Sequence, residues 1–581
     1  PLRSLLKGAS HAPVSSPDRK HPSPDRQAAM AGRLSGVLAF LAAIFLGSLR
    51  AALASAFRGS SLNVTAGRMS AEEVRATMLD ELMTALGHGN RVTKRRLEDI
   101  EEALRPMFQA LPKNEHGKMD HAASRYALHR LFVLRHGMYV KGLEPGGRGW
   151  SGSASPTEVL DDLVPAYVQS LFEQRVDGHG LGVHELSVLA ATLEHLVHDE
   201  AVARLRTAYE AHGADLEGRL PAWKVEGIVD TYMVIFLHGM SGPHVPLSEV
   251  LQRQTDIHKV YPSWPESQHF TRGVQASVSQ QHASSAEFEN GTLTFNATAL
   301  VVEEVVERYG RWQDGECRDL KSALLRLEDQ GTGRVLLKDF YGKALGGAWQ
   351  FTESEEYLRD LGALDESLPA RPSVIIPNYI NSHSNCLASS SIFSVCCLNE
   401  CDALLGQLEL KLGSPSATPS QIATLVAATP SATVEGNRTL SAALLQRLQE
   451  VADGNNGRVP LHGRLFAQWM HHAYPRECPF PHISGTTSPL RVEDWAAEPG
   501  NEVVASREEM LQHVEAPRRA AARRGSQEGE EGECAPWMDD EELLAPHAEG
   551  EAGQELEANR GRGTFLWSAV GAVGLLAAMM S

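Results

Sequence analysis

The stretch Glu328-Asp-Gln-Gly-Thr-Gly-Arg-Val-Leu-Leu-Lys-Asp-Phe340 decides the fold that we predict, because it lies between two segments with helical periodicity. Counted from Glu328, oxygen-bearing groups recur at positions 1, 3, 5, 7 and 12, with glycine at position 6 and an apolar residue at position 8. A chain that wraps a hard cation needs oxygens in this order and a sharp bend at its middle. The candidate ligands of this predicted calcium site are Glu328, Gln330, Thr332, Asp339 and Arg334, the last through its backbone carbonyl.

This order of groups resembles the calcium loop of an EF-hand. The stretch departs from the family pattern at three positions: Gln330 and Thr332 replace Asp or Asn, and Asp339 replaces the longer closing Glu. The resemblance implies a mainly α protein of repeated EF-hand-like helix-loop-helix units. It also implies that calcium is a cofactor at one weak site at most.

Three further turns repeat the pattern with poorer ligands, around Gly180, Gly218 and Gly457. The first two glycines are 38 residues apart, which is close to the spacing of paired EF-hands, so we expect their loops to pair through the apolar residues at position 8. Arg175 and Lys224 place positive charge at ligand positions of these two loops, and Gly457 is flanked by Gly and Ala where ligands are needed. We therefore expect these loops to act as packing units.

The length and the net charge of the chain indicate a protein with several folded regions that does not bind nucleic acid. A chain of 581 residues with 42% hydrophobic residues is long enough for several folded regions. A net charge of −19 argues against a nucleic-acid partner, which needs a basic surface. We predict helical domains at residues 57–245, with the paired loops, and at 300–490, with a cysteine cluster. They are joined by a linker or irregular insertion at 246–299 and followed by a disordered basic and acidic tail at 491–564.

The two ends of the chain predict a membrane protein of the secretory route. Residues 1–29 are not expected in the mature protein, because Met30 opens a signal peptide at 30–56 with an apolar core and an Ala54-Ser55-Ala56 cleavage site. An uncleaved anchor is the alternative for that segment. Residues 565–580 are apolar or small and predict a C-terminal transmembrane helix, which leaves the bulk of the chain lumenal or extracellular. The Ala-Ser-Ala-Phe junction also resembles algal plastid presequences, so a plastid membrane is an alternative location.

Cysteines and sequons fit an oxidising compartment. Four of the seven cysteines cluster without the paired spacing of zinc sites, so we predict disulfides there, with connectivity undetermined and one thiol left over. The disulfide candidates are Cys386, Cys396, Cys397 and Cys401, and the candidate glycosylation sites are Asn63, Asn290, Asn296 and Asn437.

Two enzyme hypotheses compete with a binding role. His195 and His198 share one helical face and, with Glu185, form a candidate metal site, although the H-E-x-x-H order is absent. His383 lies three residues before Cys386, a spacing that permits but does not define a cysteine nucleophile with a histidine base. We favour a non-enzymatic, membrane-anchored protein that binds or scaffolds other proteins. A lumenal metal-dependent or thiol enzyme is the alternative.

Overall fold

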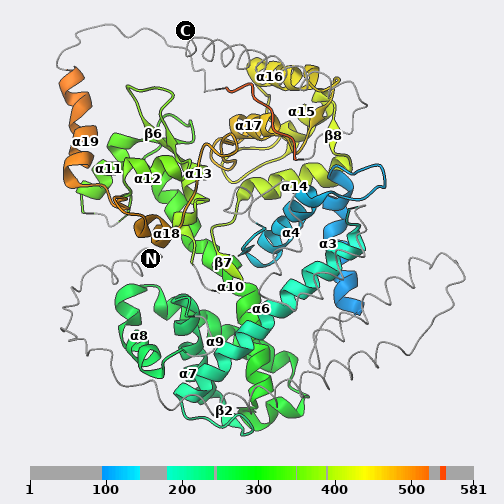
Figure 1. The fold of residues 1–581 in the computed structure, drawn as a ribbon, viewed down its shortest axis with the longest axis vertical. Helices are drawn as coiled ribbons and strands as arrows, with labels where there is room; N and C mark the ends of the chain where they lie inside the picture. The colour runs from blue at the N-terminus through cyan, green and yellow to red at the C-terminus, as the bar shows by residue number, and fades with distance from the viewer. Residues whose placement is uncertain are drawn as a thin grey trace, which may run out of the picture. The chain divides into compact units, whose positions relative to one another are not determined.

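The fold is given by a computed structural model that describes residues 94–143, 180–240, 245–347, 350–387, 390–521 and 537–544 (Figure 1). Helices dominate these residues, and the strands among them are two or three residues long. The prediction of a mainly α protein is therefore confirmed.

One arrangement recurs through the described residues. A helix is followed by a loop, a short extended segment and a second helix, and the extended segment pairs antiparallel with that of another such unit. The described residues contain four of these pairings, centred on Met119 with Leu181, Leu220 with Leu293, Val335 with Val374, and Ala417 with Val459.

The first two pairings involve helices from the first half of the chain, joined through Met119–Leu181 and through β2 with β3. Their elements are α3 (Lys94–Ala110), α4 (His121–His136), α6 (Val183–Ala211), β2 (Leu220–Pro221), α7 (Ala222–Leu237), α8 (Leu247–Val260), α9 (Trp264–Gln281), η3 (Ala286–Gly291), β3 (Thr292–Leu293) and α10 (Phe295–Leu325).

The other two pairings join β4 with β6 and β8 with β9. Their elements are β4 (Arg334–Leu336), α11 (Leu337–Leu345), α12 (Glu355–Asp360), β5 (Leu364–Asp365), β6 (Ser373–Ile375), α13 (Ile376–Ile380), η4 (His383–Asn385), α14 (Glu400–Leu412), β8 (Ser416–Ala417), α15 (Pro419–Ala428), α16 (Ala442–Asp453), β9 (Val459–Pro460) and α17 (Arg464–Ala473).

Local sequence explains why a helix starts directly after each paired residue. Asp120 follows Met119, and its side chain accepts a hydrogen bond from the Ala123 amide at the start of α4. Thr294 and Thr418 cap α10 and α15 in the same way after their paired strands. Such caps satisfy amides that the first helical turn leaves without partners. A glycine with positive φ precedes several of the paired residues by two positions, as Gly117, Gly291, Gly333 and Gly457 do.

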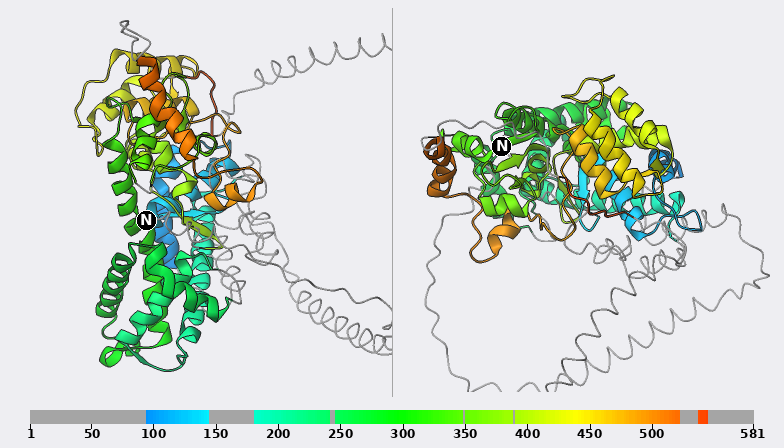
Figure 2. Two further views of the ribbon diagram at one scale, coloured as in Figure 1. Left: turned by 90° about the vertical axis from the view of Figure 1, so that its left-hand side faces the viewer. Right: turned by 90° about the horizontal axis from the view of Figure 1, so that it is seen from above.

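Two long helices each belong to two units. Helix α6 follows Leu181 of the first pairing and leads into β2 of the second, and α10 follows β3 and leads into β4. These helices also pack on each other, with α3 and α7 against α6 and with α9 against α10 (Figure 2). The first three pairings are therefore joined in succession by single continuous helices, whereas α13, η4, β7 (Phe393–Val395) and α14 lie between the third and the fourth.

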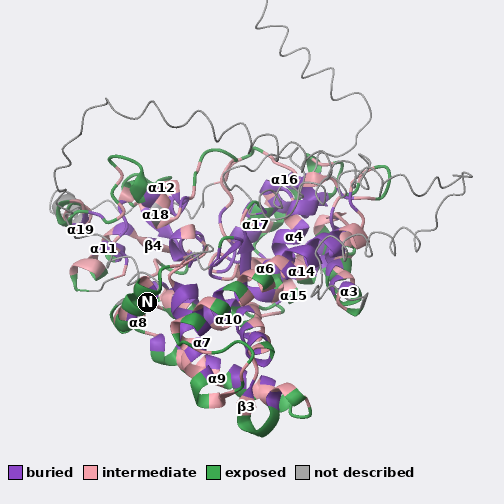
Figure 3. Cartoon of the chain, turned by 60° about the horizontal axis from the view of Figure 1, so that its bottom comes forward, coloured by how far each residue is buried: buried purple, intermediate pink, exposed green. Residues whose placement is uncertain are grey.

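Side-chain burial follows this packing (Figure 3). One core gathers around α11 and α13 and includes Phe340, Tyr379 and Trp495. A second core lies between α14, α15, α16 and α17 and includes Leu408 and Trp469. Each core closes around one of the two later strand pairings, which ties the short strands to stable packing.

The structure corrects the predicted loop pairing. Leu181 and Leu220, from the loops at Gly180 and Gly218, do not pair with each other but with Met119 and Leu293. The partner loop of Leu220 lies within residues 246–299, which were predicted as a linker and instead form α8, α9, η3 and β3. The helical pattern of this region was not recognised, because many Ser, Gln and His residues separate a small number of buried apolar residues. These include Val250, Ile257, Val274 and Val278.

The predicted division into two domains and a disordered tail also differs from the structure. Strand β1 (Met138–Val140) pairs with β7 (Phe393–Val395), so the two predicted helical domains share a sheet. Parts of the predicted tail are folded. Helix α18 (Val492–Ala497) and helix α19 (Arg507–Ala521) follow the second domain, and α19 packs on α11. Only a few apolar side chains, such as Trp495 and Met510, hold these helices, which is why the composition resembled a tail.

Candidate functional site

The predicted calcium loop lies between α10 and β4, with Gly333 at its turn. Gly333 has a φ of 73°, and a Cβ built on it would lie 2.0 Å from the carbonyl oxygen of Pro475. The loop therefore packs against the chain that follows α17. Only glycine combines this backbone conformation with so close an approach.

The first ligand position of this loop is taken by an arginine. Glu328 accepts hydrogen bonds from Nε of Arg476 at 2.8 and 2.9 Å and from the amide of Gly333 at 2.8 Å. These hydrogen bonds to Glu328 raise the pKa of Arg476, although burial opposes the charge. The guanidinium thus supplies the positive charge that a calcium ion would bring to this carboxylate.

The other candidate ligands do not converge. The Arg334 carbonyl accepts a hydrogen bond from the Asp329 amide at 2.8 Å, and Thr332 Oγ1 donates to the Asp329 carbonyl at 2.7 Å. Gln330 and Asp339 are exposed. Across the described part of the chain, no group of three or more His, Cys, Asp or Glu side chains is placed to hold a metal ion. Calcium binding at this loop stays a prediction.

The side chain of Arg334 extends the contact between the loop and α17. Its Nε donates to Asp365 Oδ2 at 2.6 Å, and its Nη1 lies 3.3 Å from Nε2 of His471. Burial works against ionisation of Asp365, but hydrogen bonds from Ser367 and Arg334 and the arginine charge lower the pKa of that carboxyl. Charged side chains of the protein therefore connect this loop to β5 and to α17.

A cavity of ≈ 310 Å³ lies between α3, α4, α6 and α10. It brings together the predicted pair His195 and His198, but not Glu185, whose carboxylate lies 3.6 Å from Lys118 Nζ near the start of α6. Sequence analysis did not assign the other acid and base groups of this cavity, because most of them come from helices distant in sequence. These groups are Arg95, Arg96, Asp99, His136, Glu194, Glu303 and Glu307.

Glu194 is the central polar group of this cavity. Its Oε1 lies 3.1 Å from His136 Nε2, and its Oε2 accepts a hydrogen bond from Arg96 Nε at 2.8 Å. Burial disfavours the Glu194 carboxylate, but the hydrogen bond from His136 and the Arg96 charge outweigh it and lower the pKa of this group. The cavity can hold a small ligand with an apolar part against Phe132, Val197 and Val306 and a polar part near Glu194.

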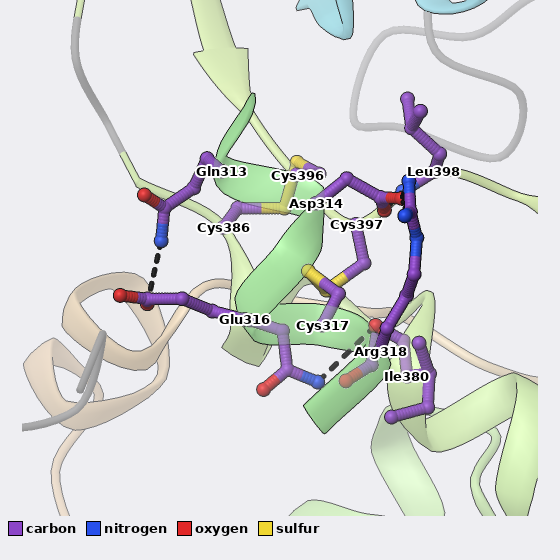
Figure 4. The surroundings of a disulfide bond; sticks show 12 residues. Gln313, Asp314, Glu316, Cys317, Arg318, Ile380, Cys386, Cys396, Cys397 and Leu398 are labelled. Atoms are coloured by element: carbon purple, nitrogen blue, oxygen red, sulfur yellow. Dashed lines mark hydrogen bonds and ion pairs between the residues drawn. A yellow bond between two sulfur atoms is a disulfide. The ribbon is translucent and has the colours of Figure 1, made fainter. Parts of the chain in front are cut away.

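All four candidate cysteines are in disulfides, and two of them pair outside the cluster. Cys386 is bonded to Cys396, while Cys397 is bonded to Cys317 and Cys401 to Cys478. Figure 4 shows the adjacent Cys396 and Cys397 joined to different partners. A bonded Cys386 carries no thiolate, and His383 Nδ1 is 2.9 Å from the Pro489 carbonyl, so this state does not form the predicted nucleophile and base.

The remaining predictions are placed as follows. Asn290, Asn296 and Asn437 are exposed, and glycosylation at these residues stays a prediction. Asn63, the signal peptide at 30–56 and the anchor at 565–580 lie outside the described residues. Within the described ranges, no helix combines the length and apolar character that a membrane span requires.

Comparison with known proteins adds no relative: no family model, no curated protein and no solved structure matches this chain.

Proposed function

We propose that this chain is a non-enzymatic, disulfide-stabilised scaffold or binding protein of the secretory route, built from EF-hand-like pairs that serve as packing units. One observation carries the proposal. Arg476 occupies both oxygens of Glu328, the first ligand of the best-preserved loop. The guanidinium of Arg476 belongs to the same chain, so a loop that it stabilises has a structural role that does not require a metal ion from solvent.

The strand pairing supports the EF-hand-like part of the proposal. In the EF-hand family, the residue at position 8 of each loop pairs with its counterpart in the neighbouring loop. Here Val335, at position 8 from Glu328, pairs with Val374. Val459, at position 8 of the loop turning at Gly457, pairs with Ala417. These pairings support the proposal of EF-hand-like units, although the candidate ligands beside them do not converge.

Three disulfides support the location. Such bonds persist in the secretory pathway and at the cell surface, whereas the cytosol keeps thiols reduced. The described residues contain the pairs Cys317–Cys397, Cys386–Cys396 and Cys401–Cys478. We propose a lumenal or extracellular placement with a membrane anchor at 565–580. A plastid membrane is the alternative, and a reporter fused to residues 30–80 distinguishes them.

Calorimetric titration and thermal unfolding of the full chain test the function. Calcium should give no heat and no rise in melting temperature, whereas a reductant should lower the melting temperature. The matched variants Glu328→Gln and Asp339→Asn should both leave the calcium titration flat. Calcium binding that disappears in these variants would replace the structural role of the loop by an ion-binding role.

A second candidate function is an enzyme that acts at the cavity of Glu194, which brings together His136, His195 and His198. These side chains are not grouped in the described chain as metal ligands would be, so binding of a small ligand is the form of this function that the cavity supports. Metal analysis of the purified full chain tests it. Stoichiometric zinc or iron that is lost in the His195→Ala, His198→Ala double variant would favour a metal-dependent enzyme with its site in this cavity. A metal-free protein would count against a metal-dependent function.

A further inference from the structure

A segment near the end of the described chain lies on the surface of α17. This terminal segment, residues 537–544 with the sequence Trp-Met-Asp-Asp-Glu-Glu-Leu-Leu, lies against residues 462–468. Its main chain adds an antiparallel bridge between Gly463 and Leu543. The Arg464 amide donates to the Glu542 carbonyl at 2.9 Å, and the Leu544 amide donates to the His462 carbonyl at 3.2 Å. The segment thus runs antiparallel to residues 462–464 through one isolated bridge and its flanking main-chain hydrogen bonds.

A buried arginine recognises the middle of the terminal segment. Arg464 is 5% exposed, and it donates from Nε to the Asp540 carbonyl at 2.8 Å and from Nη2 to the Met538 carbonyl at 3.1 Å. Gln468 is fully buried, and it exchanges two hydrogen bonds of 3.4 Å with the main chain of Met538. These contacts recognise an extended backbone and leave the side chains of Asp539 and Asp540 exposed.

The two ends of the terminal segment are recognised by side chain. The Trp537 ring stacks on His472 with centroids 5.8 Å apart, and the Arg447 guanidinium lies 5.0 Å from its centroid. Glu541 accepts a hydrogen bond from the Leu465 amide at 3.0 Å in the first turn of α17, although burial raises the pKa of this carboxyl. Glu542 accepts hydrogen bonds of 3.1 Å from the amide and hydroxyl of Ser484.

We propose that this face of α17 is a peptide-binding site. Its ligand is an extended peptide with an aromatic residue followed four and five positions later by carboxylates. The terminal segment of the same chain fills the site, and a partner peptide of this pattern displaces it. The inference names the partner class of the proposed binding function and rests on it.

Binding of a fluorescent peptide with the sequence of residues 537–544 tests the proposal. The purified full chain should bind it weakly, because its own segment occupies the site. A full-chain variant with Trp537→Ala and Glu541→Gln, in which that segment is weakened, should bind it about tenfold or more tightly than the unaltered chain.

Two altered peptides form a matched control that does not depend on folding. Replacing the acidic residues at 541 and 542 by Gln should weaken binding to the variant chain by about tenfold or more. Replacing Asp539 and Asp540 by Asn removes the same charge and should leave binding within about twofold, because those side chains are exposed.

Several results would overturn the proposal. These are no peptide binding by a variant chain that still melts cooperatively, equal binding by both chains, or equal loss with both altered peptides. If that variant chain does not fold, Trp537→Ala alone in the otherwise unaltered chain takes its place, and it should also bind the peptide more tightly than the unaltered chain does. A dimer of the unaltered chain that Trp537→Ala dissolves would assign the segment to a second copy and also overturn it. The calcium and reductant results do not depend on this outcome, so a failure here leaves the proposed scaffold role standing.

Discussion

At the scale of single residues, Gly333 carries both a conformational and a steric demand. Gly457 occupies the same position in its own loop with a φ of 77°, but a Cβ there would meet nothing within 4 Å. Gly457→Ala should therefore cost about 1 kcal/mol for the left-handed conformation alone. Gly333→Ala should cost about 2 kcal/mol more, because the methyl group meets Pro475. Urea unfolding measures both, and equal losses would contradict the close packing of this loop.

The buried side chain of His471 should make the free energy of unfolding depend on pH. Its Nδ1 donates to the Cys478 carbonyl at 2.7 Å, and its Nε2 faces the Arg334 guanidinium, so the folded state holds a neutral ring. Burial, reinforced by the charge of Arg334, lowers the pKa of His471 to about 3 from an ordinary value of 6.5. Between these values only the unfolded chain binds the proton. Stability from this residue is complete above pH 6.5 and decreases as the pH falls toward 3.

The expected loss from His471 is about 2 kcal/mol between pH 6.5 and pH 5. Denaturant unfolding across this range measures it. His471→Gln should lower stability at pH 7 and flatten the pH dependence, whereas His116→Gln, at an exposed residue, should leave the slope unchanged. The same slope in both variants would show that His471 takes up its proton without unfolding.

Sequence identified several of these residues but not their partners. The glycine at position 6 and the carboxylate at position 1 of the central loop follow from spacing alone. The partner of Glu328 is Arg476, which is 148 residues away, and no local pattern connects them. The same holds for Cys317 and Cys478, which pair with clustered cysteines from sequence separations of 80 and 77 residues.

At the scale of elements, the disulfides should differ in what they contribute. The bond Cys401–Cys478 closes a span of 77 residues, and Cys386–Cys396 closes a span of 10. A longer closed loop removes more entropy from the unfolded chain, so the double alanine variants should lose about 4.5 and about 3 kcal/mol, respectively. Denaturant unfolding under non-reducing conditions measures both. A larger loss for the short loop would indicate that local packing outweighs chain entropy.

Elements with strong helical periodicity were predictable, and those with a sparse apolar pattern were not. Helical pattern in parts of α10 and the turn of the loop after it were predicted, because apolar spacing and glycine agree there, although the start of α10 lies in the predicted linker. Helices α8 and α9 did not, since Ser, Gln and His fill their exposed faces. A usable signal was present in Asn290-Gly291-Thr292-Leu293, which repeats the glycine and apolar spacing of the central loop. Its paired residue is Leu293, as that spacing would have indicated.

At the scale of the whole described chain, distant segments depend on each other. Arg130 of α4 is 1% exposed and is bonded to Glu409 of α14 at 2.5 Å, and His462 lies 2.8 Å from the same carboxylate oxygen. Burial opposes the charge on Glu409, but the His462 hydrogen bond and the Arg130 charge lower the pKa of this carboxyl. Together with the pairing of β1 and β7, this cluster connects the two halves that sequence treated as separate domains.

A split of the chain tests this dependence. Residues 94–240 expressed alone should not melt cooperatively, because Arg130 would lose Glu409 and β1 would lose its partner strand. Co-expression with residues 245–544 should recover a complex that copurifies and melts in one transition, which circular dichroism and affinity purification measure. A cooperative melt of the first fragment alone would restore the two-domain interpretation.

The sharing of α6 and α10 between successive pairs constrains motion. In calcium sensors, an EF-hand responds by changing the angle between its two helices, which each hand can do independently when a flexible linker follows. Helix α10 has 31 residues and is about 46 Å long, with a loop of one pair at its start and of the next at its end. A tilt that opened one pair would swing the loop of the other through an arc. Because α10 is continuous from one pairing to the next, we expect a movement at one pairing to be transmitted along this helix to the other.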